Sequence, residues 1–222
     1  MSEGKYRNMD RPLFLLRYLM QNTDDEHKVS LSDLAAYCET HNHGGSRHAI
    51  SNDLDILCKY DFDIIVTKDG NKNFYSYGSR PLDTAELRLL MDAVMSAPFI
   101  SAGNTARLTR KLASIAGNHD AEKLCASVRD SHAEKTANNR VFLSIDVLHQ
   151  AITLGKKVRF RRQGKRNEIV LSPYFTQWKD NDYLVIGWSD AKCGLYAYRV
   201  DEMEIPILTD EPAVKMPIKH VV

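Results

Sequence analysis

The chain has 222 residues, of which 43% are hydrophobic and 27% are charged. Thirty Lys and Arg residues nearly balance 29 Asp and Glu residues, so the formal net charge is +1. This balance excludes a protamine-like protein and an acidic-tail protein, so any surface for nucleic acid has to be local. No apolar run reaches the roughly 18 residues of a membrane span, and the first residues lack the apolar stretch of a signal peptide. We therefore expect a cytoplasmic protein without a membrane anchor, built as one large or two small domains.

Two short helices are predicted in the first 45 residues. The first begins near Pro12 and places three apolar side chains at helical spacing: Leu13, Leu16 and Met20. The second takes Ser32 as its N-cap and has an apolar face made of Leu34, Tyr37 and Cys38. Gly44 and Gly45 then predict a tight turn.

A third helix and a hairpin are predicted after this turn. Ser46 caps the helix, whose apolar positions recur at helical spacing: Ile50, Leu54, Leu57 and Cys58. Its opposite face is polar and consists of Arg47, His48, Ser51, Asn52 and Asp55. Two β-prone runs, 63–67 and 74–77, flank a glycine turn. The order of helix, helix, turn, helix and hairpin indicates a winged helix-turn-helix.

The middle of the chain is predicted to be helical. Asp83 is a good N-cap with Glu86 three residues later, and the helix that follows has one apolar stripe: Leu87, Leu90, Met91 and Val94. Two further short helices are predicted over 101–116 and 118–128, with Leu108, Leu112 and Leu124 facing inward. This segment has more apolar surface than it can bury alone, so we expect it to pair two chains.

The last third is predicted to be a helix followed by short strands. After a polar loop over 130–139, the helix spans 144–154, and four or five antiparallel strands follow, which suggests a small barrel. Lys156 to Arg166 holds seven basic residues and no acidic one. Strand alternation places Arg159 and Arg161 on one face, which either binds the phosphates of a ligand or is simply solvated. Both interpretations stay open.

The sequence has little that indicates chemistry. It contains no nucleophile elbow, no phosphate loop and no His-Glu-x-x-His motif, so we expect no enzyme, no catalytic residues and no cofactor. The four cysteines are scattered, which is typical of reduced thiols. One stretch has the side chains of a metal site at close spacing: Cys38, His41, His43 and His48. A half-buried helix cysteine beside turn histidines near phosphates explains it more simply, and we expect no metal.

Residues 46–57, Ser-Arg-His-Ala-Ile-Ser-Asn-Asp-Leu-Asp-Ile-Leu, resemble the recognition-helix signature of DeoR-like winged-helix regulators. The stretch 80–94, with Phe99-Ile100 after it, resembles the helical linker of transcription regulators that carry a WYL domain. The last third is similar to a WYL domain through 148–152, 158–160, Ser172-Pro-Tyr174, Asp182-Tyr-Leu184 and Tyr198-Arg-Val-Asp201. The resemblance spans nearly the whole chain.

Four positions depart from these families. Ser51 and Asn52 replace the paired arginines of the DeoR-like signature, which favours base reading by Asn52 over phosphate attraction. Asp182 replaces the Trp of the Trp-Tyr-Leu triad, and Glu202 replaces the second Arg of the closing Arg-x-x-Arg pattern.

The resemblance implies an α+β fold in three segments. These are a winged helix-turn-helix DNA-binding domain over 1–80, a helical linker or dimerisation segment over 81–130, and a WYL domain over 140–210. A WYL domain is a small β-barrel of the Sm or SH3 type. The implied protein is a homodimeric regulator, with repression the favoured mode, that binds a double-stranded DNA operator. Its WYL domain would sense a nucleotide-type or single-stranded nucleic-acid effector.

In this interpretation, seven side chains contact DNA: Ser46, Arg47, His48, Ser51 and Asn52 on the recognition helix, and Lys68 and Lys72 on the wing. Five side chains bind the effector: Arg159 and Arg161 by strand alternation, and Tyr174, Tyr183 and Arg199 through the resemblance. The alternative is a binding or scaffold module without regulation. In it, the barrel binds RNA or single-stranded DNA constitutively and the winged helix docks a protein. Sequence preference and salt dependence on duplex DNA discriminate the two.

Overall fold

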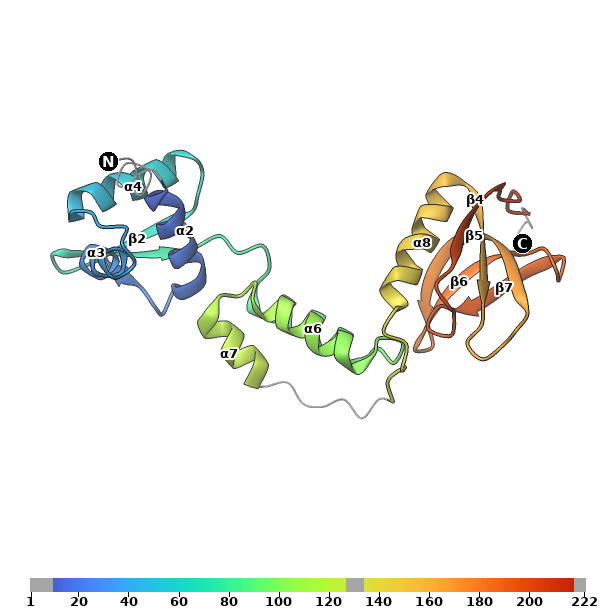
Figure 1. Cartoon of the computed structure of the whole chain (residues 1–222). Coiled ribbons are helices and arrows are strands. Elements are labelled where there is room, and N and C mark those ends of the chain that lie inside the picture. The colour runs from blue at the N-terminus through green and yellow to red at the C-terminus, as the bar shows by residue number, and fades with distance from the viewer. Residues whose placement is uncertain (1–9, 127–133, 218–222) are drawn as a thin grey trace, which may run out of the picture. The chain divides into compact units, whose positions relative to one another are not determined.

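The computed structural model describes residues 10–126 and 134–217, which form an α+β fold with seven α-helices and two antiparallel sheets (Figure 1). The chain divides into two compact units, residues 1–91 with 110–128 and residues 92–109 with 129–222. The helical segment predicted over 81–130 therefore contributes to both units. The start of the predicted first domain, 1–9, and the end of the helix predicted over 118–128 lie outside the described residues. Within those residues, no helix is long and apolar enough to cross a lipid bilayer.

Three helices begin the first unit: α2 (Arg11–Asn22), α3 (Leu31–Thr40) and α4 (Arg47–Lys59). They share one apolar core, in which Leu15, Leu19, Leu34, Ile50 and Leu54 are almost completely buried. The stripe predicted on the first helix is wrong at two of its three positions. Leu13 is 64% exposed and Met20 is 41% exposed, because α2 turns the face of Leu15 and Leu19 toward the other helices.

The ends of these helices follow local capping rules, with two corrections. The N-cap of α3 is Ser30 rather than Ser32, because Ser30 and Asp33 form a reciprocal capping box. The turn before α4 lies at His41 and Asn42 rather than at the two glycines, and Asn42 takes the left-handed conformation there, with φ 61°. Ser46 caps α4 as predicted, since its Oγ accepts a hydrogen bond from the amide of Ala49 at 3.2 Å.

The predicted hairpin is present in the first unit. Strands β2 (Ile64–Asp69) and β3 (Lys72–Tyr77) pair antiparallel, and Gly70 adopts φ 57° in the turn between them. Ile64 and Tyr75 anchor the hairpin in the core of the three helices. A two-residue strand that the sequence pattern does not reveal, β1 (Val29–Ser30), adds to the outer side of β3.

The helical segment contains α5 (Thr84–Ser96), α6 (Ala102–Ala113) and α7 (Asn118–Ala126). The predicted N-terminus of α5 is confirmed by a reciprocal pair of hydrogen bonds, 2.8 and 2.9 Å, between Asp83 and Glu86. A small core in the first unit gathers Leu87, Met91, Ala113, Ala116 and Leu124. Leu90, predicted in the same stripe as Leu87, is instead 41% exposed, because only the side of α5 that carries Leu87 and Met91 packs against this core.

In the second unit, α8 (Val141–Leu154) packs against a five-stranded sheet (Figure 1). Its strands are β4 (Lys156–Arg161), β5 (Glu168–Lys179), β6 (Asp182–Ser189), β7 (Gly194–Arg199) and β8 (Ile207–Pro212). The spatial order is β7-β6-β5-β4-β8, so β7 and β8 are the edge strands. β8 was not predicted, and the closure of these strands into a barrel stays a prediction.

The core of the second unit lies between α8 and the sheet. Leu148 and Ala151 of α8 pack against the inward side chains of the strands, which include Val158, Leu171 and Val185. α8 ends at Gly155, whose φ of 61° terminates the helix in the left-handed conformation. The alternation of buried and exposed residues along β4 turns Arg159 and Arg161 outward.

Candidate nucleic-acid interface

The first turns of α4 expose the polar side chains predicted to contact DNA. Ser46, Arg47, His48 and Asn52 are exposed and Ser51 is half-buried, while Ile50, Leu54 and Leu57 on the opposite face are buried. The structure therefore brings all five predicted residues of α4 together on one polar face. Arg and Asn side chains can make bidentate hydrogen bonds to guanine and adenine edges in the major groove.

The hairpin β2–β3 carries the other two predicted residues. Lys68 on β2 and Lys72 on β3 are both exposed, close to the turn that joins the strands. A third cation belongs to this region, because Nζ of Lys28 donates a hydrogen bond to Oγ1 of Thr67 at 3.1 Å. The sequence pattern does not indicate Lys28, since only the pairing of β1 with β3 brings it to the hairpin.

The histidines between α3 and α4 pack in an aromatic cluster. The ring of Phe14 on α2 stacks on His43 at 4.2 Å and on Tyr37 at 5.1 Å, and His41 contacts Tyr37 at 4.2 Å. Cys38 is buried beside them, and burial raises the pKa of its thiol, which opposes metal binding because the thiolate is the ligand form. Across 10–126 and 134–217, no group of three potential metal ligands is found.

The residues predicted to bind an effector lie at separate places in the second unit. Arg159 lies opposite Val170 on β5, whereas Arg199 lies in the row that crosses β5 at Gln177. These rows are on the order of 20 Å apart along the strand, at roughly 3.3 Å per residue. Arg159 lines a depression beside β8, and Arg199 lines another, of about 270 Å³, with Tyr196.

The charge of Arg199 is largely compensated by neighbouring carboxylates. Its guanidinium donates hydrogen bonds to both carboxylate oxygens of Asp201, at 3.0 and 3.2 Å, and lies 3.3 Å from Asp182 and 3.6 Å from Glu202. These hydrogen bonds raise the pKa of Arg199. Asp182 and Glu202, the two departures from the WYL pattern, therefore both form ion pairs with this arginine.

The two predicted tyrosines differ in how their hydroxyls are satisfied. The hydroxyl of Tyr183 hydrogen-bonds with Oγ1 of Thr176 at 3.1 Å, and its ring lies 5.3 Å from that of Phe99. The hydroxyl of Tyr174 is buried and has no hydrogen-bond partner among the described residues, and burial raises its pKa.

Most of the basic cluster 156–166 is ion-paired. Lys156 pairs with Asp210 at 3.1 Å, Lys157 with Asp190 at 2.7 Å, Arg159 with Glu168 at 3.7 Å and Arg162 with Glu202 at 2.8 Å. Arg161, Lys165 and Arg166 have no ion pair in the described part of the chain. The positive surface is therefore smaller than the sequence indicates.

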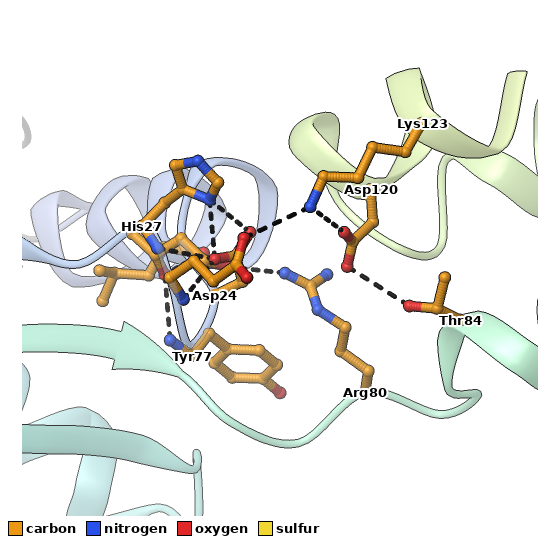
Figure 2. A network of polar contacts seen from close by, with 10 residues as sticks. Asp24, His27, Tyr77, Arg80, Thr84, Asp120 and Lys123 are labelled. Carbon is orange, nitrogen blue, oxygen red and sulfur yellow. Dashed lines mark hydrogen bonds and ion pairs between the residues drawn. The ribbon is translucent and has the colours of Figure 1, made fainter. Parts of the chain in front are cut away.

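A polar network joins the three-helix core to the helical segment inside the first unit (Figure 2). The guanidinium of Arg80 donates to three carbonyl oxygens: Thr23 at 2.7 Å, Met20 at 3.1 Å and Ile115 at 3.4 Å. Gly117 leaves room for this group, because a Cβ there would lie 2.7 Å from Arg80.

The second half of this network involves α7 (Figure 2). Lys123 contacts Asp120 at 3.3 Å and Glu26 at 3.5 Å, and the ring of His27 stacks on that of His119 at 3.8 Å. Asp24 is partly buried, but hydrogen bonds from His27 lower the pKa of its carboxyl. Oγ1 of Thr84 also donates a hydrogen bond to Oδ2 of Asp120 at 3.4 Å. The network therefore connects the end of α2 to α7 and to the start of α5.

Comparison with known proteins does not identify the family. No family model and no curated protein matches the chain. Among solved structures, proteasome accessory factor B/C (PafBC) of Arthrobacter aurescens matches with a TM-score of 0.33 and 16% sequence identity. The match covers 93% of this chain and 34% of that one, so the chain spans about a third of its length.

Proposed function

We propose that the chain is a sequence-specific DNA-binding transcription regulator with a winged helix-turn-helix. The observation that carries the proposal is the exposed polar face at the start of α4, in a unit whose β2–β3 hairpin exposes two lysines close to its turn. In a winged helix-turn-helix, the recognition helix enters the major groove and its N-terminal residues contact base edges. Arg47 and Asn52 would read bases, and Lys68 and Lys72 would contact phosphates.

The regulator is proposed to bind its operator as a homodimer. α5 carries two exposed apolar side chains, Leu89 at 72% and Leu90 at 41% exposure, on the segment expected to pair two chains. Two copies would present two recognition helices to the half-sites of a double-stranded operator. A monomer in light scattering at the concentrations used for DNA binding would contradict the proposed homodimer.

The second unit is proposed to be a WYL-type small barrel that senses a nucleotide-type or single-stranded nucleic-acid effector. Its outward arginines and its depressions beside Arg159 and Arg199 support this role. Effector binding would change the affinity for the operator, with repression the favoured mode. Linkage makes the coupling reciprocal, so the operator must change effector affinity by the same factor.

The proposal is tested by fluorescence anisotropy over a salt series. The probes are a duplex that the protein enriches from a random library, a scrambled duplex of the same composition, and the two single strands. We expect selective duplex binding that weakens in Arg47→Ala and in Asn52→Ala. Arg17→Ala, an exposed arginine on α2, is the matched control and keeps the selectivity.

A constitutive RNA or single-stranded DNA binding module is the second candidate function. It is favoured by one observation, that Arg161, Lys165 and Arg166 project from the β4–β5 hairpin without ion pairs in the described ranges. Binding to single strands alone, lost when these three residues are changed to Ala, would establish it and would leave α4 as a protein-docking surface.

A further inference from the structure

A buried ion pair ties α4 to the start of α2. Nε of Arg11 donates a hydrogen bond to Oδ2 of Asp53, and the two residues are only 7% and 6% exposed. Burying two charges costs desolvation energy that their attraction only partly offsets, and apolar side chains of similar volume are often as stable or more stable. Stability alone is therefore a weak reason for a carboxylate at this position of α4.

The same guanidinium also holds the loop that leads into α4. Nη1 of Arg11 donates a hydrogen bond to the carbonyl oxygen of Gly44 at 3.0 Å. A Cβ on Gly45 would lie 2.7 Å from Nη1 and 3.0 Å from Cζ, so the guanidinium occupies the space that a side chain would need. Gly45 does not have a positive φ, which leaves this close approach as the reason for glycine.

We propose that Arg11 is a positioning residue for DNA reading, an inference that rests on the proposed function. Through Asp53 it fixes the rotation of α4, and through Gly44 it fixes the path of the chain into the N-cap Ser46. Arg47 and His48 follow that cap directly. Side-chain contacts to base edges read the sequence and need the helix held within about 0.5 Å of its productive place, whereas phosphate contacts carry no sequence information. Loss of the contacts of Arg11 with Asp53 and Gly44 therefore lowers sequence discrimination more than it lowers total affinity for DNA.

Two sets of variants separate positioning from stability. Arg11→Met combined with Asp53→Leu replaces the ion pair by apolar side chains. Gly45→Ala displaces the guanidinium but keeps both charges. Gly44→Ala is its matched control, because a Cβ there meets nothing within 4 Å, the carbonyl group is kept and the entropy change of the unfolded chain is the same. Each full-length variant is melted by circular dichroism and then titrated with the enriched duplex and with the scrambled duplex.

We expect the double variant and Gly45→Ala to melt as folded proteins and to bind the scrambled duplex as the wild type does. Their preference for the enriched duplex should fall about tenfold, the loss of one base contact. Gly44→Ala should keep the wild-type preference. Undiminished preference in both the double variant and Gly45→Ala would overturn the inference. If the double variant does not fold, the comparison of Gly45→Ala with Gly44→Ala decides.

A separate readout covers the case in which the wild type enriches no duplex, which would be a failure of the proposed function. The amides of Ala49 and Ile50 bond to Ser46 in the first turn of α4, so their hydrogen exchange reports on that turn. Faster exchange in Gly45→Ala than in Gly44→Ala would show that Arg11 holds the start of α4. Equal exchange in the two variants would refute it.

Discussion

Two basic surfaces of the molecule differ in what surrounds their charges. The cluster 156–166 has seven basic residues in sequence, but four of them form ion pairs with carboxylates from other parts of the second unit. The surface of α4 and its hairpin has fewer cations, and no ion pair to Arg47, Lys68 or Lys72 is found in the described residues. Asp53, the buried acidic residue of α4, forms an ion pair with Arg11. The number of basic side chains available to a polyanion therefore depends on which of them are ion-paired in the fold, and the count of basic residues in the sequence does not give it.

The largest effect is expected from removing one partner of the buried pair. Arg11→Ala leaves the carboxylate of Asp53 buried without its cation, which costs about 3–5 kcal/mol of folding free energy. Urea unfolding monitored by circular dichroism measures the loss. Arg162→Ala, which breaks an exposed pair with Glu202, is the control and should change the unfolding free energy by less than about 1 kcal/mol. Similar losses in the two variants would contradict the distinction between a buried pair and a surface pair.

The next effect concerns base reading. Arg47→Ala and Asn52→Ala should each reduce discrimination between the enriched and the scrambled duplex by about 1–3 kcal/mol, because each would remove a bidentate base contact. Anisotropy titrations at one salt concentration measure this difference. Arg161→Ala, on the other basic surface, should leave discrimination unchanged. A loss of selectivity in Arg161→Ala equal to that in Arg47→Ala would move duplex recognition to the second unit.

A smaller and uniform effect is expected at the hairpin. Lys72→Ala should weaken binding to every duplex alike and lower the salt slope by about one counterion, since a phosphate contact carries no base information. The slope of log affinity against log salt checks this. Asn73→Ala, an exposed neutral residue beside it, is the control and keeps the slope. A sequence-dependent loss in Lys72→Ala would instead place this lysine at a base edge.

Features that depend on residues close together in the chain could be predicted from the sequence. Ser46 as the cap of α4, the Asp83 and Glu86 capping box and the hairpin turn each depend on residues a few positions apart, and all three are present. By contrast, the pair of Arg11 with Asp53 and the pairing of β8 with β4 join residues more than 40 positions apart. No periodicity records such contacts.

The α2 helix shows the same limit within a single element. It has apolar residues on more than one face, so helical spacing alone allows either Leu13, Leu16 and Met20 or Leu15 and Leu19 as the buried stripe. Only the positions of α3 and α4 decide between them. The candidate DNA-contacting face was easier to predict, because the buried stripe of α4 is unambiguous and leaves one polar face.

The smallest effect tests whether ion pairing is what limits the cluster 156–166. Asp210→Asn with Glu211→Gln removes the ion-pair partner of Lys156 and one of the two ion-pair partners of Lys157 without changing the size of the side chains. These pairs are on the surface, so folding stability should hardly change, whereas binding of single-stranded DNA should strengthen and its salt slope should steepen. Asp146→Asn with Glu122→Gln makes the same change in net charge at two exposed residues that form no ion pair with the cluster in the described part of the chain, and is the control. If both double variants strengthen binding equally, net charge rather than local pairing limits this surface. If only the Asp210 and Glu211 variant strengthens binding, the carboxylates of β8 limit the binding of nucleic acid by the cluster 156–166.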